Sequence, residues 1–276
     1  MNPHTGAPTS DLLSGATRVY YIVGDPIAQV KSPSGVSAAF HARGHNAYVM
    51  PAHVAPPDLA PWLAGVSLAQ NVDGVIVTIP HKFAAFDLCA TTSERAAFLG
   101  AVNTLRRNAD GTWHGDMFDG AGFIAAMQAN GVDPRGQRAL LVGAGGAGSA
   151  IAQALVMAGA SHLAVHDDDG LRRANLIHRL ARLNRCEVRA GSSDPQGFDV
   201  IVNATPAGMK TTDALPIPMD AVSAGLFVGC VITAPEVTPL IAEARLRGCK
   251  TVTGTQMFAK VRDLMVDFLL DAPHAH

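Results

Sequence analysis

Three glycines that follow an apolar run have the type and spacing to bind a phosphate group. Leu140–Val142 leads into Gly143, Gly145 and Gly148, and an alanine-rich segment follows. We expect a strand, a tight turn at Gly143 and a helix packed closely at Gly148, with Gly145 letting backbone N–H groups approach a pyrophosphate. Glycine-rich turns also occur without a ligand, so the surrounding sequence has to decide. The residues predicted to contact a dinucleotide here are Gly143, Ala144, Gly145, Gly146, Ala147 and Gly148.

Three consecutive acids follow the next apolar run, Leu163–His166. They lie about 20 residues beyond the glycine turn, where an acidic side chain accepts hydrogen bonds from the adenine ribose of a dinucleotide. We expect Asp167 or Asp168 to take that role, while Asp169 caps the helix that begins near Leu171; capping alone is the simpler alternative. Because carboxylates repel a 2′-phosphate and no arginine is expected at this strand end, NAD is favoured over NADP as cofactor.

A lysine and an aspartate have the chemistry for proton transfer. Lys82 follows an apolar strand that ends at Pro80, and Asp119 begins the segment before the glycine-turn region. Open α/β sheets bind ligands beyond the carboxyl ends of their strands, and a lysine–carboxylate pair there can take the proton of an alcohol while its hydride goes to a nicotinamide. From periodicity alone, a solvated lysine and a helix-capping aspartate are the simpler interpretation.

The first half of the chain must position Lys82 on alternating strands and helices. Ser32 and Pro33 are typical of a helix start, with Ser32 as N-cap and Pro33 at the first helical position. The predicted strands are 18–23, 47–51, 74–80, 102–107 and 112–115. The predicted helices are 32–43, 59–68, 82–89 and 94–99.

The second half predicts a Rossmann unit around the glycine turn. A helix over 119–130 precedes it, and later strands are expected at 187–189, 198–204, 225–232 and 250–252, with a helix at 239–247 and an amphipathic helix at 257–270. The alternation favours an α/β protein of two domains with mainly parallel sheets, about six parallel strands surrounding the turn. We expect a first domain at 1–118, a Rossmann domain at 119–255, and a C-terminal helix at 256–276 that packs back on the first domain.

Composition sets limits on partners and location. The chain has 276 residues, 48% hydrophobic and 16% charged, with a net charge of −2, so neither nucleic acid nor an anionic membrane is expected as a partner. No segment has the length of a membrane span or the pattern of a signal peptide, and a cytoplasmic protein with mobile ends at 1–16 and 272–276 is expected. Four dispersed cysteines suggest buried thiols, with no disulfide framework and no metal site. They are Cys89, Cys186, Cys230 and Cys249.

Motifs between Tyr20 and Phe268 resemble those of the shikimate dehydrogenase family. They are Gly24-Asp25-Pro26-Ile27 with Lys31-Ser32-Pro33, Val77–Lys82, Gly100–Leu105, Asp116–Phe123, Asn203–Met209 and Thr238-Pro239-Leu240. The resemblance implies a two-domain, NAD(P)-dependent alcohol dehydrogenase whose first domain binds a cyclic hydroxy acid such as shikimate or quinate, with Lys82 and Asp119 as the acid/base pair. The other residues that it implies are Gln29, Ser32, Thr78 and Asn103 for the substrate, and Asn203, Thr205, Pro206, Gly208, Met209, Gly254 and Met257 for the cofactor.

Several polar substrate-binding positions of that family are occupied differently here. Val30 replaces a serine, Ile76 an asparagine, Met117-Phe118 an Asn-Thr pair, Cys230 an aspartate, Thr233 a tyrosine and Val261 a glutamine. Each unpaired substrate group would cost about 1–3 kcal/mol. Either Gln29, Lys31 or other groups replace the missing contacts, or the substrate differs. Asp167-Asp168-Asp169 also replaces the family's NADP-binding Asn-Arg-Thr, in agreement with NAD.

Two alternatives stay open beside a shikimate or quinate dehydrogenase. One is the same chemistry on another alicyclic or amino-substituted hydroxy acid. The other is a non-catalytic, NAD-binding regulatory protein, which has no need of Lys82 and Asp119. His81 and His114 are interpreted as ordinary packing or surface residues, and the protein is expected to be a monomer or a homodimer.

Overall fold

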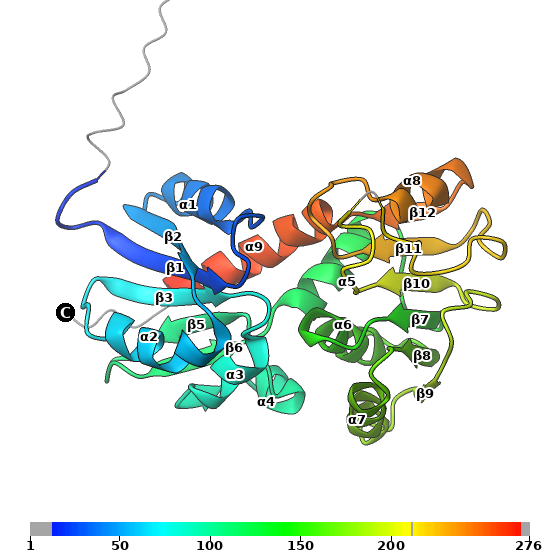
Figure 1. Ribbon diagram of the computed structural model, residues 1–276, viewed down its shortest axis with the longest axis horizontal. Coiled ribbons are helices and arrows are strands. Elements are labelled where there is room, and N and C mark those ends of the chain that lie inside the picture. The colour runs from blue at the N-terminus through cyan, green and yellow to red at the C-terminus, as the bar shows by residue number, and fades with distance from the viewer. Residues whose placement is uncertain (1–12, 211, 272–276) are drawn as a thin grey trace, which may run out of the picture. The chain divides into compact units, whose positions relative to one another are not determined.

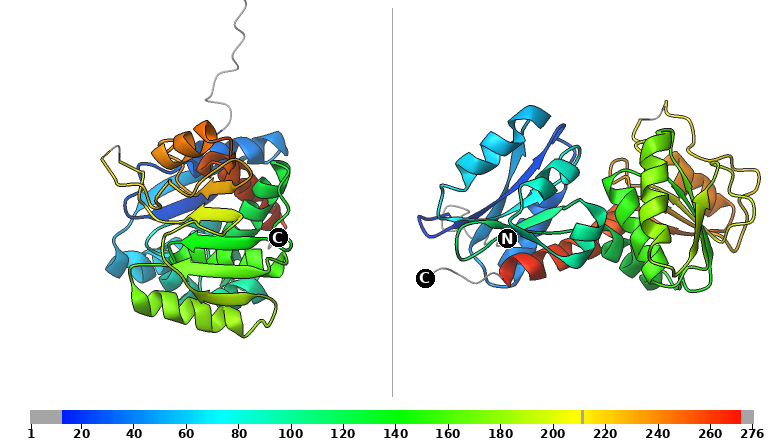
Figure 2. Two further views of the ribbon diagram at one scale, coloured as in Figure 1. Left: turned by 90° about the vertical axis from the view of Figure 1, so that its right-hand side faces the viewer. Right: turned by 90° about the horizontal axis from the view of Figure 1, so that it is seen from below.

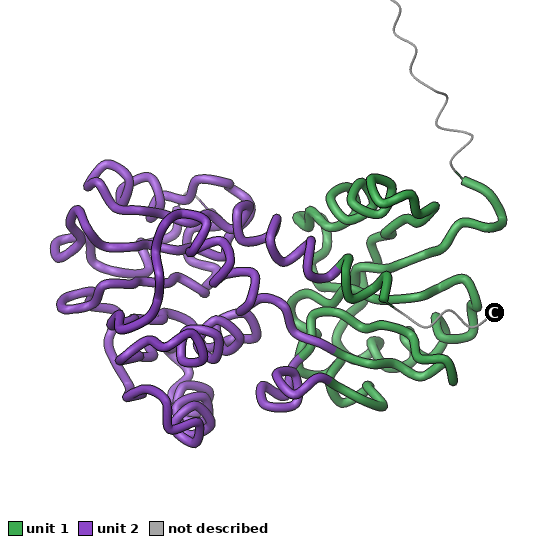
Figure 3. The backbone as a smooth tube through the Cα atoms, turned by 180° about the vertical axis from the view of Figure 1, so that it is seen from behind, with its two compact units in different colours: residues 1–92, 102–115, 266–276 green, residues 93–101, 116–265 purple. Residues whose placement is uncertain are grey.

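The protein is described from a computed structural model that covers residues 13–210 and 212–271, so most of the two predicted mobile ends lie outside the described residues. Two compact units make up the chain (Figure 3). The first contains residues 1–92, 102–115 and 266–276, and the second contains 93–101 and 116–265. The domain limits expected from the sequence, 1–118 and 119–255, are not tested by these two units and stay a prediction.

A six-stranded sheet forms the centre of the first unit, in the order β2-β1-β3-β5-β6-β4 (Figure 1). β1 is parallel to both β2 and β3, β4 is parallel to β6, and β5 is antiparallel to β3. The strands are β1 (Arg18–Gly24), β2 (Ala47–His53), β3 (Val72–Val77), β4 (Thr91–Thr92), β5 (Thr104–Arg107) and β6 (Trp113–Asp116). The helices are α1 (Ser32–Ala42), the 3-10 helix η2 (Pro56–Asp58), α2 (Leu59–Val66) and α3 (Lys82–Asp87).

Helices cover both faces of this sheet. Neighbouring residues of a strand point to opposite faces, and Tyr20 of β1 packs on Phe40 of α1 while Tyr21 packs edge-on against Trp62 of α2. α1 and α2 therefore lie on opposite sides, as the right-hand view in Figure 2 shows. All six positions of β3 are buried, which explains its almost unbroken apolar sequence.

A second six-stranded sheet, entirely parallel, forms the centre of the second unit, in the order β12-β11-β10-β7-β8-β9. The predicted Rossmann arrangement of about six parallel strands is thus confirmed. The strands are β7 (Arg138–Val142), β8 (His162–His166), β9 (Glu187–Ala190), β10 (Val200–Asn203), β11 (Phe227–Cys230) and β12 (Lys250–Val252). The helices are α4 (Glu94–Leu99), α5 (Asp119–Ala129), α6 (Gly146–Met157), α7 (Gly170–Ala181), α8 (Pro239–Leu246) and α9 (Gly254–Leu270), the last of which continues into the first unit.

Strand residues of the second sheet alternate between two packed faces. Val228 and Cys230 of β11 join a buried cluster with Ile241 of α8. Phe227, which precedes Val228 and points to the other face, meets Phe123 of α5 edge-on, with ring centroids 6.1 Å apart. The sheet is thus a buried platform between helices, and its strand ends present the glycine turn and the loops after β8 and β10.

The start of α1 differs from the prediction. Ser32 is the first helical residue, Lys31 occupies the cap position without a side-chain cap bond, and Pro33 is second in the helix. Ser32 is buried, 4% exposed, so its side chain lies inside the unit and does not cap the helix from solvent. The prediction that Ser32 is the N-cap is therefore wrong.

The cysteines are all free, as the sequence suggests, but only Cys230 and Cys249 are buried. Cys89 is partly exposed, and burial raises the pKa of its thiol to about 12. Among the described residues, no helix has the length and apolarity to cross a membrane.

Candidate active site

The glycine turn has the geometry of a phosphate cradle. Gly143 has φ +101°, and a Cβ there would lie 2.8 Å from the carbonyl carbon of Ala204. A Cβ on Gly148 would lie 2.0 Å from the carbonyl oxygen of Gly143, so the close approach of α6 to the turn requires glycine. At Gly145, by contrast, no described atom outside its two chain neighbours lies within 4 Å of the Cβ position. Two glycines therefore shape the turn, and the third leaves open space beside it.

The N-terminus of α6 supplies donors to this open space. Gly145 is its cap residue, with extended backbone and no side-chain cap bond. The first N–H groups of a helix have no acceptor within the helix, and the helix dipole adds positive charge at this end. The residues present therefore fit the pyrophosphate of a dinucleotide, whose place is at such a terminus.

Asp167 braces the glycine turn from the end of β8. Its Oδ2 accepts a hydrogen bond from the N–H of Ala144 at 2.6 Å, and its Oδ1 accepts one from the N–H of Asp169 at 2.8 Å. The side chain is buried, whereas that of Asp168 is fully exposed. Of the two acids predicted to contact ribose, Asp168 alone presents a carboxylate to solvent.

Asp169 caps α7, as the simpler interpretation of the acid run proposed. Its carboxylate accepts from the N–H groups of Leu171 and Arg172, at 3.1 and 3.0 Å, and the hydrogen bond from Arg172 is the main reason that its pKa is below the ordinary value. The cap also turns the following side chains back toward the acids.

The expectation of no arginine at this strand end is wrong. Arg172 Nη2 lies 3.2 Å from Asp167 Oδ1 and 3.5 Å from Asp169 Oδ2, and Arg173 Nη1 donates to the carbonyl of Asp167 at 3.4 Å. Both arginines are in the first turn of α7, so a helix start returns them to the acids that precede it. The charge argument against a 2′-phosphate therefore loses one of its two premises.

The loop after β10 is shaped by side chains that bond its own backbone. Asn203 Oδ1 accepts from the N–H and the hydroxyl of Thr205 at 3.0 and 2.7 Å, and its Nδ2 donates to the carbonyl of Ala207 at 3.1 Å. Asp213 accepts from the N–H groups of Gly208 and Lys210, where Gly208 has φ +106°. Asp213 was missed from the sequence because an Asp five residues after a glycine has no distinctive pattern.

The predicted cofactor residues of this loop thus lie in or beside a turn that its own hydrogen bonds hold in place. Thr205, Pro206 and Gly208 lie within the bonded turn, and Met209 is 39% exposed beside it. At the start of α9, a Cβ on Gly254 would lie 2.2 Å from the carbonyl oxygen of Ile232, and Met257 is buried.

In the first unit, backbone bonds tie the Lys82 segment to the Asn103 segment. The N–H of Val102 donates to the carbonyl of Lys82 at 2.9 Å, and the N–H of Val77 donates to the carbonyl of Asn103 at 2.8 Å. Asn103 is 1% exposed and accepts from the hydroxyl of Thr104 at 3.1 Å. Lys82, the first residue of α3, is partly exposed. The carboxyl end of β3 therefore gathers these two predicted residues.

The loop that follows β1 contacts the segment at the carboxyl end of β3. The N–H of Asp25 donates to the carbonyl of Ile79 at 2.9 Å, and a Cβ on Gly24 would lie 2.4 Å from Cγ2 of Thr78. Gln29 Nε2 donates to the carbonyl of Pro26 at 3.0 Å, so this partly exposed side chain closes its own loop. Thr78 therefore lies against this loop and Gln29 is engaged with backbone, while the substrate-binding roles of both stay predictions.

Asp119 is the first residue of α5 and 6% exposed. The next residue, Gly120, is pressed against α6, because a Cβ there would lie 2.2 Å from the carbonyl oxygen of Ala150. Lys82 and Asp119 belong to different compact units, and their pairing remains a prediction.

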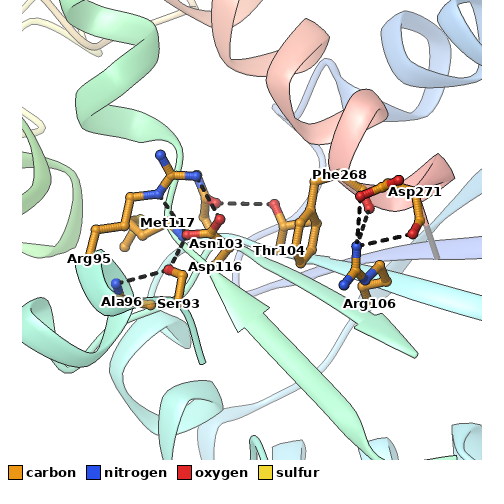
Figure 4. A network of polar contacts seen from close by, with 10 residues as sticks. All are labelled: Ser93, Arg95, Ala96, Asn103, Thr104, Arg106, Asp116, Met117, Phe268 and Asp271. Atoms are coloured by element: carbon orange, nitrogen blue, oxygen red, sulfur yellow. Dashed lines mark hydrogen bonds and ion pairs between the residues drawn. The ribbon is translucent and has the colours of Figure 1, made fainter. Parts of the chain in front are cut away.

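A buried network around Asp116 precedes Asp119 and was missed from the sequence (Figure 4). Asp116 accepts from Arg95 Nε and Nη2 at 2.7 and 2.6 Å, from the N–H of Met117 at 2.7 Å and from the hydroxyl of Ser93. Burial raises the pKa of Asp116, but these hydrogen bonds outweigh it, and the pKa lies below its ordinary value. The signal in the sequence that could have indicated this network is the position of Asp116, three residues before the predicted catalytic Asp119.

The apolar replacements noted in the sequence are mostly packing residues. Ile76 and Met117 are 2% and 1% exposed, and Val261 packs so closely on α5 that a Cβ on Gly122 would lie 2.2 Å from its Cγ2. His81 is buried with Nε2 2.8 Å from the carbonyl of Val54, and this contact favours a packing role.

Comparison with known proteins agrees with this arrangement. Residues 22–105 match the model of the shikimate dehydrogenase substrate binding domain, and residues 128–186 match that of the ThiF family. The NADP(+)-dependent shikimate dehydrogenase of Rubrobacter xylanophilus is 36% identical over 250 residues, which cover 89% of this chain and 88% of that protein.

Two solved structures have the same fold. The 5-ketofructose reductase of a Gluconobacter strain has a TM-score of 0.82 at 28% identity, and the quinate dehydrogenase of Corynebacterium glutamicum, solved with NAD, has a TM-score of 0.83 at 27% identity. Each match covers 92% of this chain and 93% of the other. The identity and coverage along nearly the whole length show that the chain belongs to the shikimate dehydrogenase family.

Proposed function

We propose that this protein is an NAD(P)-dependent alcohol dehydrogenase that transfers hydride between the nicotinamide and a ring hydroxyl of shikimate, quinate or a related cyclic hydroxy acid. The observation that carries the proposal is the retention of Lys82 and Asp119 together with a glycine turn that fits a pyrophosphate. Membership of the family supports it, since the relatives are named shikimate and quinate dehydrogenases.

The proposed division of work follows from the chemistry of each group. The dinucleotide supplies the hydride acceptor when it is bound. Lys82 takes the hydroxyl proton at Nζ as general base, and Asp119 orients the lysine. Asn103 and Thr78, held at the carboxyl end of β3, are proposed to orient the ring hydroxyls. A pure binding protein needs neither the lysine nor the aspartate.

We also propose that NAD is preferred to NADP. The support is Asp168, a fully exposed carboxylate at the end of β8 that would repel a 2′-phosphate. Arg172 argues the other way, although Asp167 and Asp169 already neutralise it. Cytoplasmic location and a monomeric or homodimeric state stay predictions from the sequence.

The first experiment is an initial-rate assay of NAD and NADP reduction with shikimate and with quinate. We expect reduction with at least one of the acids and a higher kcat/KM with NAD. A higher kcat/KM with NADP would overturn the cofactor proposal alone. Binding of NAD without oxidation of either acid would contradict the substrate proposal and leave a regulatory NAD-binding protein as an alternative.

A second candidate is the same hydride transfer on another alicyclic or amino-substituted hydroxy acid. The apolar side chains of Ile76, Met117 and Val261 favour it, because none of them can hydrogen-bond a substrate. The likeness to a 5-ketofructose reductase supports the idea that this fold accepts other substrates. A panel of cyclic hydroxy acids and polyol ketones, assayed for NADH oxidation or formation, discriminates between the two candidates.

A further inference from the structure

We propose that Asp116 is a positioning residue for Asp119, and that Arg95 and Ser93 of the α4 segment give it this role. The inference rests on the proposed function of Asp119 as the partner of the catalytic lysine. All four residues belong to the second compact unit.

The carboxylate of Asp116 is held by four donors from two segments. Arg95 donates from Nε to Oδ1 and from Nη2 to Oδ2, a bidentate geometry that fixes both the position and the plane of the carboxylate. Ser93 donates its hydroxyl to Oδ1 and, as N-cap of α4, accepts from the N–H of Ala96 at 3.2 Å. The serine therefore links Asp116 to the start of a helix.

Each residue between Asp116 and Asp119 is tied to this network. The N–H of Met117 donates to Asp116 Oδ1 at 2.7 Å. The ring of Phe118 lies under the guanidinium of Arg95, 4.5 Å from its carbon to the ring centroid. Met117 and Phe118 are 1% and 4% exposed, so neither side chain has room to move without disturbing the unit.

The start of α5 has no side-chain cap of its own. Its cap residue, Phe118, has helical backbone angles and makes no side-chain cap bond. A helix that begins without a cap frays at its first turn unless something else holds it. Downstream, Gly120 is fixed against the backbone of Ala150 in α6. Asp119 therefore lies between two fixed points, the Arg95–Asp116 network before it and the Gly120 contact after it.

We expect loss of the Asp116 network to lower kcat more than it lowers the affinity for the dinucleotide. Displacing a reacting group by about 1 Å can lower turnover about 100-fold. The residues of the glycine turn make none of the hydrogen bonds of the Asp116 network, so we expect loss of this network to leave the affinity for the dinucleotide unchanged. A shift in kcat without a shift in nucleotide affinity separates positioning from general destabilisation.

The test compares Asp116→Ala with a matched control in the first unit. Arg18 and Asp73 form a similar bidentate pair with a buried carboxylate, so Asp73→Ala removes a comparable interaction away from Asp119 in the chain. With shikimate or quinate, whichever the parent protein oxidises, Asp116→Ala should lower kcat about 100-fold at unchanged dissociation constant for the dinucleotide. Asp73→Ala should lower the melting temperature and leave kcat within about twofold.

A double-variant cycle separates positioning of Asp119 from general destabilisation, and the milder variant Arg95→Lys keeps the inference falsifiable if Asp116→Ala is unstable. In the background of Asp119→Asn, Asp116→Ala should lower kcat no further, because the group that it positions is already lost. Arg95→Lys, which keeps the charge but loses the fork, should give an intermediate kcat. Equal losses in both backgrounds would show a purely structural role and overturn the inference.

Failure of the proposed function is distinguishable from failure of this inference. If Asp119→Asn keeps full activity, or if the parent protein oxidises neither acid, the proposed function falls and the inference falls with it. If Asp119→Asn is impaired while Asp116→Ala keeps its kcat, only the positioning role is overturned.

Discussion

The dinucleotide region and the substrate region of this protein are built in different ways. Around the glycine turn, carboxylates and amides bond the backbone: Asp167 holds the N–H of Ala144, and Asn203 holds its own loop. Around the end of β3, backbone bonds hold the segments, and the chemistry is proposed to come from the side chains of Lys82 and Asn103. We call the dinucleotide region backbone-built, because backbone N–H groups are proposed to bind its ligand, and the substrate region side-chain-built, because side chains are proposed to bind its ligand. A backbone-built region tolerates few substitutions, whereas a side-chain-built region can change its specificity one residue at a time.

The most severe test of the backbone-built region is Gly148→Ala. The new methyl group would lie 2.0 Å from the carbonyl oxygen of Gly143, so α6 must move away from the turn. We expect a loss of about 3 kcal/mol in the free energy of unfolding, because overpacking against backbone cannot relax through a rotamer change. Urea unfolding measures this loss, and calorimetric titration should show no NAD binding up to millimolar concentration. Wild-type stability would mean that the close packing of α6 is not required.

Gly145→Ala separates the ligand role from the folding role. No described atom crowds its Cβ position, so the free energy of unfolding should stay within about 0.5 kcal/mol of wild type. The methyl group would instead occupy the space proposed for the pyrophosphate, and the dissociation constant for NAD should rise about 30-fold, equal to about 2 kcal/mol. Unchanged NAD affinity would place the pyrophosphate elsewhere.

Asp168→Asn sharpens the comparison at the cofactor. Removing the exposed charge should raise kcat/KM with NADP relative to NAD about tenfold, which corresponds to about 1.4 kcal/mol. Asp220→Asn, another exposed acid of the second unit, is the control and should leave the ratio unchanged. If both variants keep the wild-type ratio, Asp168 does not discriminate between the cofactors.

The smallest expected effect is the pH dependence that Asp116 gives to stability. Its folded pKa lies below the ordinary value, so its contribution is present above the unfolded pKa near 3.8 and is lost as the pH falls through the folded pKa. The free energy of unfolding should therefore fall more steeply below pH 4 for wild type than for Asp116→Asn. Parallel curves from urea unfolding between pH 7 and pH 3 would contradict this assignment.

Much of the fold could be predicted because its signals are local. The glycine spacing predicted the turn before α6, and apolar runs predicted the parallel strands of the second sheet. The cap of α7 by Asp169 was also an expected alternative. The helix beginning at Ser32 was predicted correctly, but the N-cap role of Ser32 was wrong, because this buried residue is the first of the helix and Lys31 precedes it at the cap position.

Interactions between distant segments could not be predicted in the same way. Arg95 in α4 and Asp116 at the end of β6 are separated by the whole of β5, and nothing in either local sequence indicates the other. Arg172 returns to Asp167 only because α7 begins between them. For the same reason the sequence predicts the cofactor class from the backbone-built turn, while the substrate depends on side chains whose contacts arise from tertiary packing.

The central claim is that Lys82 accepts the proton in a dehydrogenase reaction. Its most direct test is kcat of Lys82→Ala with the oxidised acid, together with the dissociation constant for the dinucleotide; Lys260→Ala, an exposed lysine of α9, is the control. Loss of a general base should lower kcat about 1,000-fold while the dinucleotide affinity stays unchanged, and Lys260→Ala should keep the wild-type rate. A near-normal rate for Lys82→Ala would remove Lys82 from the mechanism and contradict the proposal.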